Sequence, residues 1–277
     1  VTLPVENREV LAAVNKDDRP PAMPNGGFPP LSRLGGVARP DYGQVRYRPE
    51  AHNVLHGLVS RTVFPDTDGT ADGPVLVAVA DGMGGHAAGE VASRIAIDTV
   101  TTVEGPLGER VEEANRSVME AAENRADQHG MGTTLTAGLF GPDGTLEVGH
   151  VGDSRLYLFR RTTLLQVTQD HSLVAQYLAS GAISAEEAAV HPRRNVITRA
   201  LGIGWEVTAD THTVHLRPGD RVLICSDGLT SMVGDDAITA ILEAQPAPQA
   251  TGWALIEAAN QAGGEDNITV AIVDAVE

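Results

Sequence analysis

Apolar residues recur along this chain with two different periods, and the period predicts the type of element. Val111, Ala114, Val118 and Ala121 are spaced three and four residues apart, which is typical of one face of an amphipathic helix. Val91, Ile95 and Val100 follow a similar, less regular spacing. Helices are therefore predicted over 88–100, 108–126, 171–181, 184–190, 235–244 and 250–263.

Between these helices lie short apolar runs that are bounded by Gly, Pro and Asp, and such runs are typical of β-strands. Strands are predicted over 53–64, 73–81, 133–140, 146–160, 164–168, 207–216, 221–229 and 267–275. Several strands follow one another without an intervening helix, which favours antiparallel sheets over βαβ units. With two helices early and two late, the pattern predicts an α+β fold: a four-layer α-β-β-α sandwich of two antiparallel sheets flanked by helices.

Residues 1–40 are rich in Pro and Gly and show no sustained periodicity, which is typical of an irregular tail or linker. We therefore expect one folded domain over 41–277. Within it, the two short helices predicted after the central strands belong to an insertion over about 171–204.

The chain carries 20 Lys and Arg against 37 Asp and Glu, a formal net charge of −17. Such a surface repels nucleic acid and anionic lipid, so neither is expected as a partner. No stretch approaches the roughly 18 apolar residues of a membrane span, and the N-terminus has no apolar signal-peptide core, so a cytoplasmic location is expected. The single cysteine, Cys225, excludes an intramolecular disulfide and is expected to be a small core residue.

Four aspartates stand at predicted strand ends or turns, beside residues that should be buried: Asp81, Asp153, Asp227 and Asp266. Each alone has an ordinary explanation, because Asp is common in turns. Together they are expected to converge at the ends of the sheets. Buried carboxylates need compensation from arginine, backbone N–H groups or a divalent metal. Oxygen ligands with few accompanying His or Cys favour Mg²⁺ or Mn²⁺ over Zn²⁺.

The stretch "ADGMGGHAAGE", residues 80–90, places small residues directly after Asp81. Glycines let the backbone bend and approach an ion, and small residues let the following helix pack close to the sheet. A competing interpretation is the dinucleotide-binding fingerprint, which Gly82, Gly84 and Ala87 fit. Asp81 would then face a pyrophosphate with its own negative charge, and the downstream strands are not βαβ, so the metal interpretation is preferred.

Seven motifs carry a resemblance to a known family, in the order "VAVADGMGGHAAGEVAS", "MGTTLTAGLF", "VGHVGDSRLYLFR", "QDHSLVAQYLASGAIS", "RNVITRALG", "LICSDGLTSMV" and "GGEDNITVAIVD". Together they resemble the metal-dependent protein Ser/Thr phosphatases of the PP2C (PPM) family, in its bacterial branch, over about residues 41–277. The resemblance implies a monomeric enzyme that hydrolyses phosphoserine and phosphothreonine in proteins, the products of bacterial Ser/Thr kinases. It also implies a β-sandwich with a cleft at one edge, where a metal-activated water attacks phosphorus at a binuclear Mn²⁺ or Mg²⁺ centre.

The resemblance assigns roles to the aspartates position by position. Asp81 would bridge the two ions, and the carbonyl of Gly82 would complete the ligands of one of them. Asp227 and Asp266 match the ligands of the other ion. Asp153, in "GDSR", matches a position that is linked to a third, weaker ion.

The segment "DYGQVRYRPEA" resembles the first motif of the family, G-x-x-R-x-x-N-E-D. On that alignment Arg46 would bind the substrate phosphate and Glu50 would contact a metal through water. Pro49 replaces the asparagine and Ala51 replaces the aspartate that supports the metal shell. Loss of a supporting carboxylate typically weakens metal affinity or activity about 10–100-fold.

The leaving serine or threonine oxygen needs a proton. Met83 occupies the position where some relatives carry a histidine, so His86 is the candidate general acid, with water as the alternative. The insertion over 171–204 resembles the flap that borders the cleft in bacterial members, and it places Arg193 and Arg194 where they could meet an acidic or phosphorylated substrate. A phosphatase-like regulatory or binding module with weak or no catalysis is the alternative function, favoured by the altered first motif and opposed by the four intact aspartates.

Overall fold

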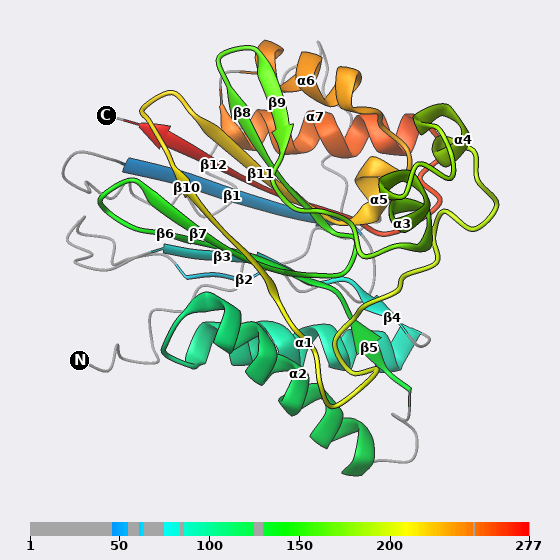
Figure 1. Ribbon diagram of the computed structural model, residues 1–277. Coiled ribbons are helices and arrows are strands. Elements are labelled where there is room, and N and C mark those ends of the chain that lie inside the picture. Colours follow the sequence, from blue (N-terminus) through cyan, green and yellow to red (C-terminus); the bar gives the residue numbers. More distant parts are fainter. Residues whose placement is uncertain are drawn as a thin grey trace.

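A computed structural model describes residues 46–54, 61–63, 75–83, 86–124, 130–245 and 247–276, and for 46–54, 61–63, 86–87, 189 and 276 it describes the backbone alone. The predicted tail over residues 1–40 lies outside these residues. Figure 1 shows two stacked sheets, with one pair of helices below them and another pair above. The predicted four-layer α-β-β-α sandwich is confirmed.

The first sheet orders its described strands as β10-β7-β6-β3-β2, and every neighbouring pair is antiparallel. These strands are β2 Arg61–Val63, β3 Val75–Val79, β6 Leu135–Phe140, β7 Thr145–Val151 and β10 Asp210–His215. Helices α1 (His86–Thr102) and α2 (Leu107–Asn124) cover its outer face. Both helices were predicted from their apolar spacing.

The second sheet has the order β1-β12-β11-β8-β9, again with antiparallel neighbours. Its strands are β1 Arg46–Val54, β8 Arg155–Arg160, β9 Thr163–Gln166, β11 Arg221–Cys225 and β12 Ile268–Val276. Helices α6 (Asp235–Ala244) and α7 (Pro248–Gln261) cover its outer face. They correspond to the two late helices predicted from the sequence.

The central strands bury both faces, which explains why they read as continuous apolar runs and not as alternating ones. On β3, Val75, Val77 and Val79 pack into the core between the two sheets, whereas Leu76 and Ala78 pack against α1 and α2. On β11 the same division places Cys225 in the core beneath α6 and α7. Cys225 is fully buried, as predicted, and burial raises the pKa of its thiol to about 12.

The insertion between β9 and β10 contains two short helices, α3 (Leu173–Ala179) and α4 (Ala185–Ala189). Ser172 caps α3 by accepting a hydrogen bond from Ala175 N, and Ser184 and Glu187 form a capping box at the start of α4. We call residues 171–204 the flap. Among the described helices, none is long and apolar enough to cross a membrane.

Several elements differ from the predictions. The strand predicted over 53–64 is divided between β1 and β2, and β1 begins earlier, at Arg46. Pro49 and two arginines interrupt the apolar pattern there, so the sequence did not predict this part of the strand. The two-residue strands β4 (Gly82–Met83) and β5 (Gly132–Thr133) are too short to show a period. Residues 227–229, predicted as the end of a strand, instead begin the short helix α5 (Asp227–Thr230).

Candidate metal centre

Asp81 leaves the end of β3 with its backbone held in place by two threonines. Its N–H donates to Thr134 Oγ1 at 3.0 Å, and its carbonyl accepts from Thr134 N at 2.8 Å and from Thr133 Oγ1 at 2.9 Å. The Thr134 hydroxyl also contacts Ser154 Oγ at 2.8 Å. Because Ser154 follows Asp153, this buried hydroxyl pair ties the strand end that carries Asp81 to the turn that carries Asp153.

Gly82 lies against helix α1 at a distance that excludes any side chain. A Cβ on Gly82 would lie 2.0 Å from the carbonyl oxygen of Gly89, and a Cβ on Gly89 would lie 2.7 Å from the carbonyl carbon of Gly82. The small residues after Asp81 therefore let the helix approach the backbone of β4 directly, as the sequence predicted.

Asp227 is brought to Asp266 by a second close approach. A Cβ on Gly228 would lie 2.0 Å from Asn267 O, so only glycine allows the start of α5 to touch the segment before β12. Ser226 fastens this contact, since its N–H donates to Thr269 O at 3.0 Å and its Oγ accepts from Thr269 N at 3.1 Å. Asp227 and Asp266 thus stand side by side at the edge of the second sheet.

Asp153 lies in the turn between β7 and β8, directly after Gly152, which has a φ of 116° and so needs glycine. Its side chain is buried. Burial, followed by the negative charges of Asp227 and Asp170, raises the pKa of Asp153 to about 7. The turn therefore directs a carboxyl group toward the same region as Asp227, which begins α5.

The carboxyl groups of Asp81 and Asp227 are within hydrogen-bonding reach of each other. Both residues are partly exposed, yet burial of the carboxyl group is the largest cause that raises the pKa of each. The charge of Asp227, then those of Asp266 and Asp153, raise the pKa of Asp81 further. The four predicted aspartates therefore act on one another in a single acidic cluster.

The donors present in this cluster fit hard divalent cations. Asp227 Oδ1 is buried and has no hydrogen-bond partner among the described residues, so it leaves a lone pair free for an ion. The donor set is carboxylate and carbonyl oxygen, which suits Mg²⁺ and Mn²⁺. Within the described ranges, no group of three or more His, Cys, Asp or Glu side chains is placed so that these side chains alone could hold a metal ion.

The remaining predicted site residues occupy defined backbone positions, but their side chains lie outside the part that the structure describes. Arg46 and Glu50 are on β1, where their Cα partners on β12 are Val276 and Ile272. His86 is the first residue of α1. Their assigned roles stay predictions.

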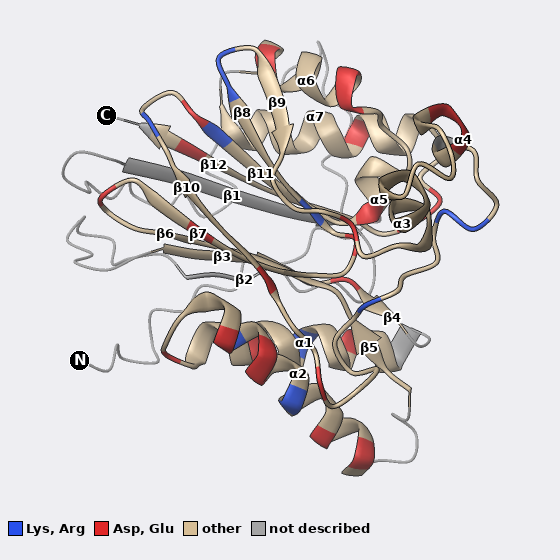
Figure 2. Ribbon diagram, in the orientation of Figure 1, with Lys and Arg blue, Asp and Glu red and all other residues tan. Residues whose placement is uncertain are grey.

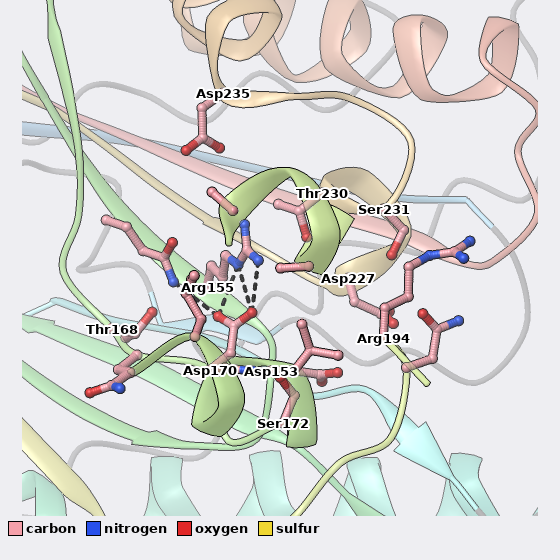
Figure 3. A pocket seen from close by; sticks show the side chains of 18 of the residues that line it. Asp153, Arg155, Thr168, Asp170, Ser172, Arg194, Asp227, Thr230, Ser231 and Asp235 are labelled. Atoms are coloured by element: carbon pink, nitrogen blue, oxygen red, sulfur yellow. Dashed lines mark hydrogen bonds and ion pairs between the residues drawn. The ribbon is translucent and has the colours of Figure 1, made fainter. Parts of the chain in front are cut away.

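Beside the cluster, a cavity of about 860 Å³ lies between the flap and the segment from α5 to α6. Asp153 and Asp227 line it, together with Arg194 from the flap and Asp235 from the start of α6 (Figure 3). The acidic cluster is therefore open on one side to a space that a peptide could enter.

The cavity wall contains a bidentate ion pair that the sequence interpretation did not assign. Arg155 Nε donates to Asp170 Oδ1 at 2.9 Å, and Arg155 Nη2 donates to Asp170 Oδ2 at 2.7 Å (Figure 3). Arg155 Nη1 also donates to Tyr157 OH at 2.9 Å, and that hydroxyl donates to Asp235. The motifs "GDSR" and "QDH" contain this pair, but nothing in the sequence showed that their charges meet.

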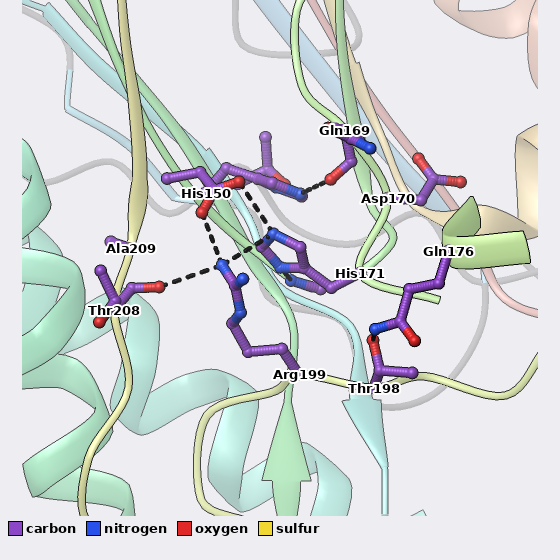
Figure 4. Close-up of polar contacts among 12 residues, drawn as sticks. His150, Gln169, Asp170, His171, Gln176, Thr198, Arg199, Thr208 and Ala209 are labelled. Carbon is purple, nitrogen blue, oxygen red and sulfur yellow. Dashed lines mark hydrogen bonds and ion pairs between the residues drawn. The ribbon is translucent and has the colours of Figure 1, made fainter. Parts of the chain in front are cut away.

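The flap is fastened to the Asp153 turn through His171. Gly152 N donates to His171 Nδ1 at 3.0 Å, and His171 Nε2 lies 3.1 Å from Asp210 Oδ2 and 2.9 Å from Arg199 Nη1. Arg199, near the flap's end, donates to Asp210 Oδ1 at 2.6 Å and to Thr208 O at 3.2 Å (Figure 4). Both ends of the flap therefore meet at one polar cluster behind the acidic site.

A family model described as protein phosphatase 2C matches residues 64–251. Among curated relatives, the serine/threonine phosphatase stp of Listeria monocytogenes serovar 1/2a is 39% identical over 249 residues, covering 85% of this chain and 94% of the relative. The serine/threonine protein phosphatase PstP of Mycobacterium tuberculosis is 42% identical over 221 residues, covering 76% of this chain and 42% of the relative.

Solved structures resemble the fold at similar identity. The catalytic domain of PstP in complex with two manganese ions has a TM-score of 0.71 at 36% identity, covering 84% of this chain and 99% of that one. The serine/threonine phosphatase of S. agalactiae has a TM-score of 0.73 at 32% identity, covering 83% of this chain and 100% of that one.

Proposed function

This chain belongs to the protein phosphatase 2C family and is a metal-dependent protein serine/threonine phosphatase, and we propose that its aspartate cluster holds the ions on which hydrolysis depends. Asp81, Asp227 and Asp266 are the proposed ligands of two Mn²⁺ or Mg²⁺ ions, with the Gly82 carbonyl completing one ligand set. Asp153 is the proposed ligand of a third ion. When bound, the ions supply electrophilic activation of water and of the phosphoryl group.

The observation that carries this proposal is the contact between Asp81 and Asp227, together with the unpartnered Asp227 Oδ1. Like charges held together in a buried place are unfavourable unless a cation or a proton compensates them. A divalent cation would relieve this repulsion and occupy the free oxygen. The alternative, a phosphatase-like binding module, gains no support from this arrangement, because a binding module has no need of neighbouring buried carboxyl groups.

Three residues on β1 and α1 are proposed to act on the substrate and its surroundings. Arg46 binds the phosphoryl oxygens with two parallel N–H donors, which fixes the orientation of the phosphate. Glu50 supports the metal shell through water. His86 holds the proton that the departing serine or threonine oxygen takes up, with water as the alternative donor.

The substrates are proposed to be phosphoproteins made by bacterial Ser/Thr kinases, and the enzyme is proposed to act as a monomer over residues 41–277. The cavity beside the cluster supports a peptide substrate, because it is bordered by the flap on one side and by α5 and α6 on the other. The cytoplasmic location expected from the sequence stays a prediction.

The test is hydrolysis of p-nitrophenyl phosphate and of a phosphothreonine peptide by the purified protein with Mn²⁺ or with EDTA. We expect turnover only with the metal, and a loss of at least about 100-fold in Asp227→Asn, since this change removes a direct ligand. Asp236→Asn, an exposed aspartate on α6, is the matched control and should retain full activity. Equal activity in the two variants, or turnover that persists in EDTA, would refute the proposal.

A further inference from the structure

The turn at the end of the flap, residues 202–205, exposes two large apolar side chains. Ile203 is 62% exposed and Trp205 is 48% exposed, and only Gly204 separates them. We call these two side chains the apolar ledge. Single exposed apolar residues are common on protein surfaces, but two so close together on one short turn need an explanation.

This turn is rigid, because a buried amide holds its backbone. Asn115 on α2 is fully buried, and its Nδ2 donates to Gly204 O at 2.8 Å and to Trp205 O at 3.2 Å. Its Oδ1 accepts from Gly202 N at 2.9 Å. These three hydrogen bonds of the Asn115 side chain therefore all go to residues 202–205, and they hold the backbone that carries the ledge.

The packing of Gly202 fixes the start of the turn as well. Gly202 has a φ of 86°, which favours glycine, and a Cβ there would lie 2.5 Å from Met131 O and 2.7 Å from Val118 Cγ1. The chain thus enters the turn pressed against α2 and β5. The exposure of Ile203 and Trp205 is consequently a property of a fixed backbone.

The ledge is continuous with the metal centre. Leu201, just before the turn, exchanges two backbone hydrogen bonds with Thr133, of 3.0 and 2.9 Å, and Thr133 pairs in turn with Gly82. A Cβ placed on Gly132 would lie 3.2 Å from Ile203 Cδ1 and 3.3 Å from Met83 Cγ. Both side chains therefore border the same space beside Gly132. Met83 is the residue that follows the proposed ligand Gly82.

We propose that the apolar ledge binds apolar side chains of the phosphoprotein substrate that flank the phosphorylated serine or threonine. This inference rests on the proposed phosphatase function. An extended chain advances about 3.3–3.6 Å per residue, so a side chain two or three positions from the phosphorylated residue can reach Ile203 while the phosphate is at the aspartates. The flap cavity and the ledge would then lie on two sides of the bound peptide.

A second copy of the chain is a weaker candidate for the same surface. Stable protein interfaces bury about 800 Å² on each partner, and two side chains on one turn provide far less. A short peptide segment needs much less area, because the phosphate and the metal centre supply most of its binding.

The test compares two phosphothreonine peptides of the same length, one with leucine and phenylalanine two and three residues from the phosphate and one with serine there. Ile203→Ser and Trp205→Ser should each lower kcat/KM for the apolar peptide about tenfold, since one buried apolar side chain contributes about that factor. Hydrolysis of the serine peptide and of p-nitrophenyl phosphate should change less than twofold. Leu165→Ser, which removes a 57% exposed leucine from β9, is the matched control and should change none of the three.

Binding can be followed separately from catalysis by fluorescence. The chain has two tryptophans, so Trp253→Phe leaves Trp205 as the only one. A non-hydrolysable phosphonate analogue of the apolar peptide should shift its emission to the blue, and the serine analogue should not. No shift when the analogue fully inhibits p-nitrophenyl phosphate hydrolysis would overturn the proposal.

The remaining outcomes are equally decisive. Equal losses on all three substrates would mean that the ledge only supports the fold of the metal centre, and the proposal would fail. Light scattering that shows a dimer dissociated by Trp205→Ser would assign the ledge to self-association instead. If the wild type hydrolyses no phosphate ester with any metal, the phosphatase function itself fails, a result distinct from loss of the apolar preference alone.

Discussion

At the scale of single residues, Asp227 shows how burial and charge together define the site. One of the Asp227 carboxyl oxygens, Oδ1, has no hydrogen-bond partner among the described residues. The Asp81 carboxyl group lies within hydrogen-bonding reach of the Asp227 carboxyl group. Replacing such a residue by a neutral one would relieve repulsion in the metal-free protein, so Asp227→Asn is expected to fold while losing its ions. The cluster is therefore arranged for binding at the expense of stability.

Asn115 is the residue whose loss should be most costly for the turn that it holds. Asn115→Ala leaves the N–H of Gly202 and the carbonyls of Gly204 and Trp205 without their present partner. We expect the free energy of unfolding to fall by about 2 kcal/mol, measured by urea denaturation. Asn124→Ala, at the exposed end of the same helix, is the control and should change it by less than about 0.5 kcal/mol. Equal effects would contradict this role of Asn115.

His150 should make stability depend on pH. Burial, with a further contribution from the nearby His171, lowers the pKa of His150 to about 4, below its ordinary value of about 6.5. The unfolded chain therefore binds a proton at a pH where the folded protein does not, so the stabilising effect is complete above about pH 6.5 and is lost as the pH falls toward 4. Each pH unit in this window changes the free energy of unfolding by about 1.4 kcal/mol.

The measurement for His150 is urea denaturation at pH 6.5 and at pH 5. Between pH 6.5 and pH 5, the free energy of unfolding of the wild type should fall by about 2 kcal/mol more than that of His150→Gln, because glutamine does not titrate. The same loss in both proteins would show that other groups, such as the neighbouring His171 and Asp210, cause the pH dependence.

At the scale of elements, the approach of α1 to β4 positions the proposed metal ligands. Gly89→Ala would place a methyl group 2.7 Å from Gly82, so the helix must move outward. We expect a loss of about 1–3 kcal/mol in stability and weaker Mn²⁺ binding, measured by thermal denaturation and calorimetric titration. Gly234→Ala, where a Cβ would meet nothing within 4 Å, should leave Mn²⁺ binding unchanged. Unaltered Mn²⁺ binding in Gly89→Ala would show that the contact between α1 and β4 does not position the metal ligands.

The flap is the element that should recognise charge on the substrate. Arg193 and Arg194 are exposed, and neither guanidinium group forms an ion pair with another described residue. Figure 2 shows this basic loop in blue beside α4, on a chain with many acidic positions, in red. Reversing both charges to glutamate should lower kcat/KM for an acidic phosphopeptide about tenfold or more, because like charges now meet.

A small aryl phosphate does not extend to the flap, so its hydrolysis by the charge-reversed variant should be nearly unchanged. Reversal of Arg116 and Arg94, on α2 and α1, supplies a control with the same change in net charge. Equal effects on the peptide and on the aryl phosphate would exclude the flap from peptide recognition.

At the scale of the whole molecule, most of the layered fold could be predicted from the sequence. The spacing on α2 and the continuous apolar runs of β3 and β11 reflect burial that extends along the whole element. β4, β5 and α5 were missed because each is set by contacts with distant segments, such as Gly82 with Thr133 and Gly228 with Asn267. Such contacts leave no period in the sequence.

The candidate site was predictable in its residue types but not in its surroundings. The aspartates were recognisable because each follows an apolar strand or precedes one. The pairing of Arg155 with Asp170 and the hold of Asn115 on the 202–205 turn join residues far apart in the chain. The chain order contains no signal for these pairs, so the flap cavity and the apolar ledge could be found only in three dimensions.

The most direct test of the central claim is a crystal structure of the protein soaked with Mn²⁺, with the ions located by anomalous scattering. The account predicts two strong peaks beside Asp81, one coordinated by the Gly82 carbonyl and the other by Asp227 and Asp266. Peaks elsewhere on the surface, with none between these carboxylates at saturating Mn²⁺, would contradict it.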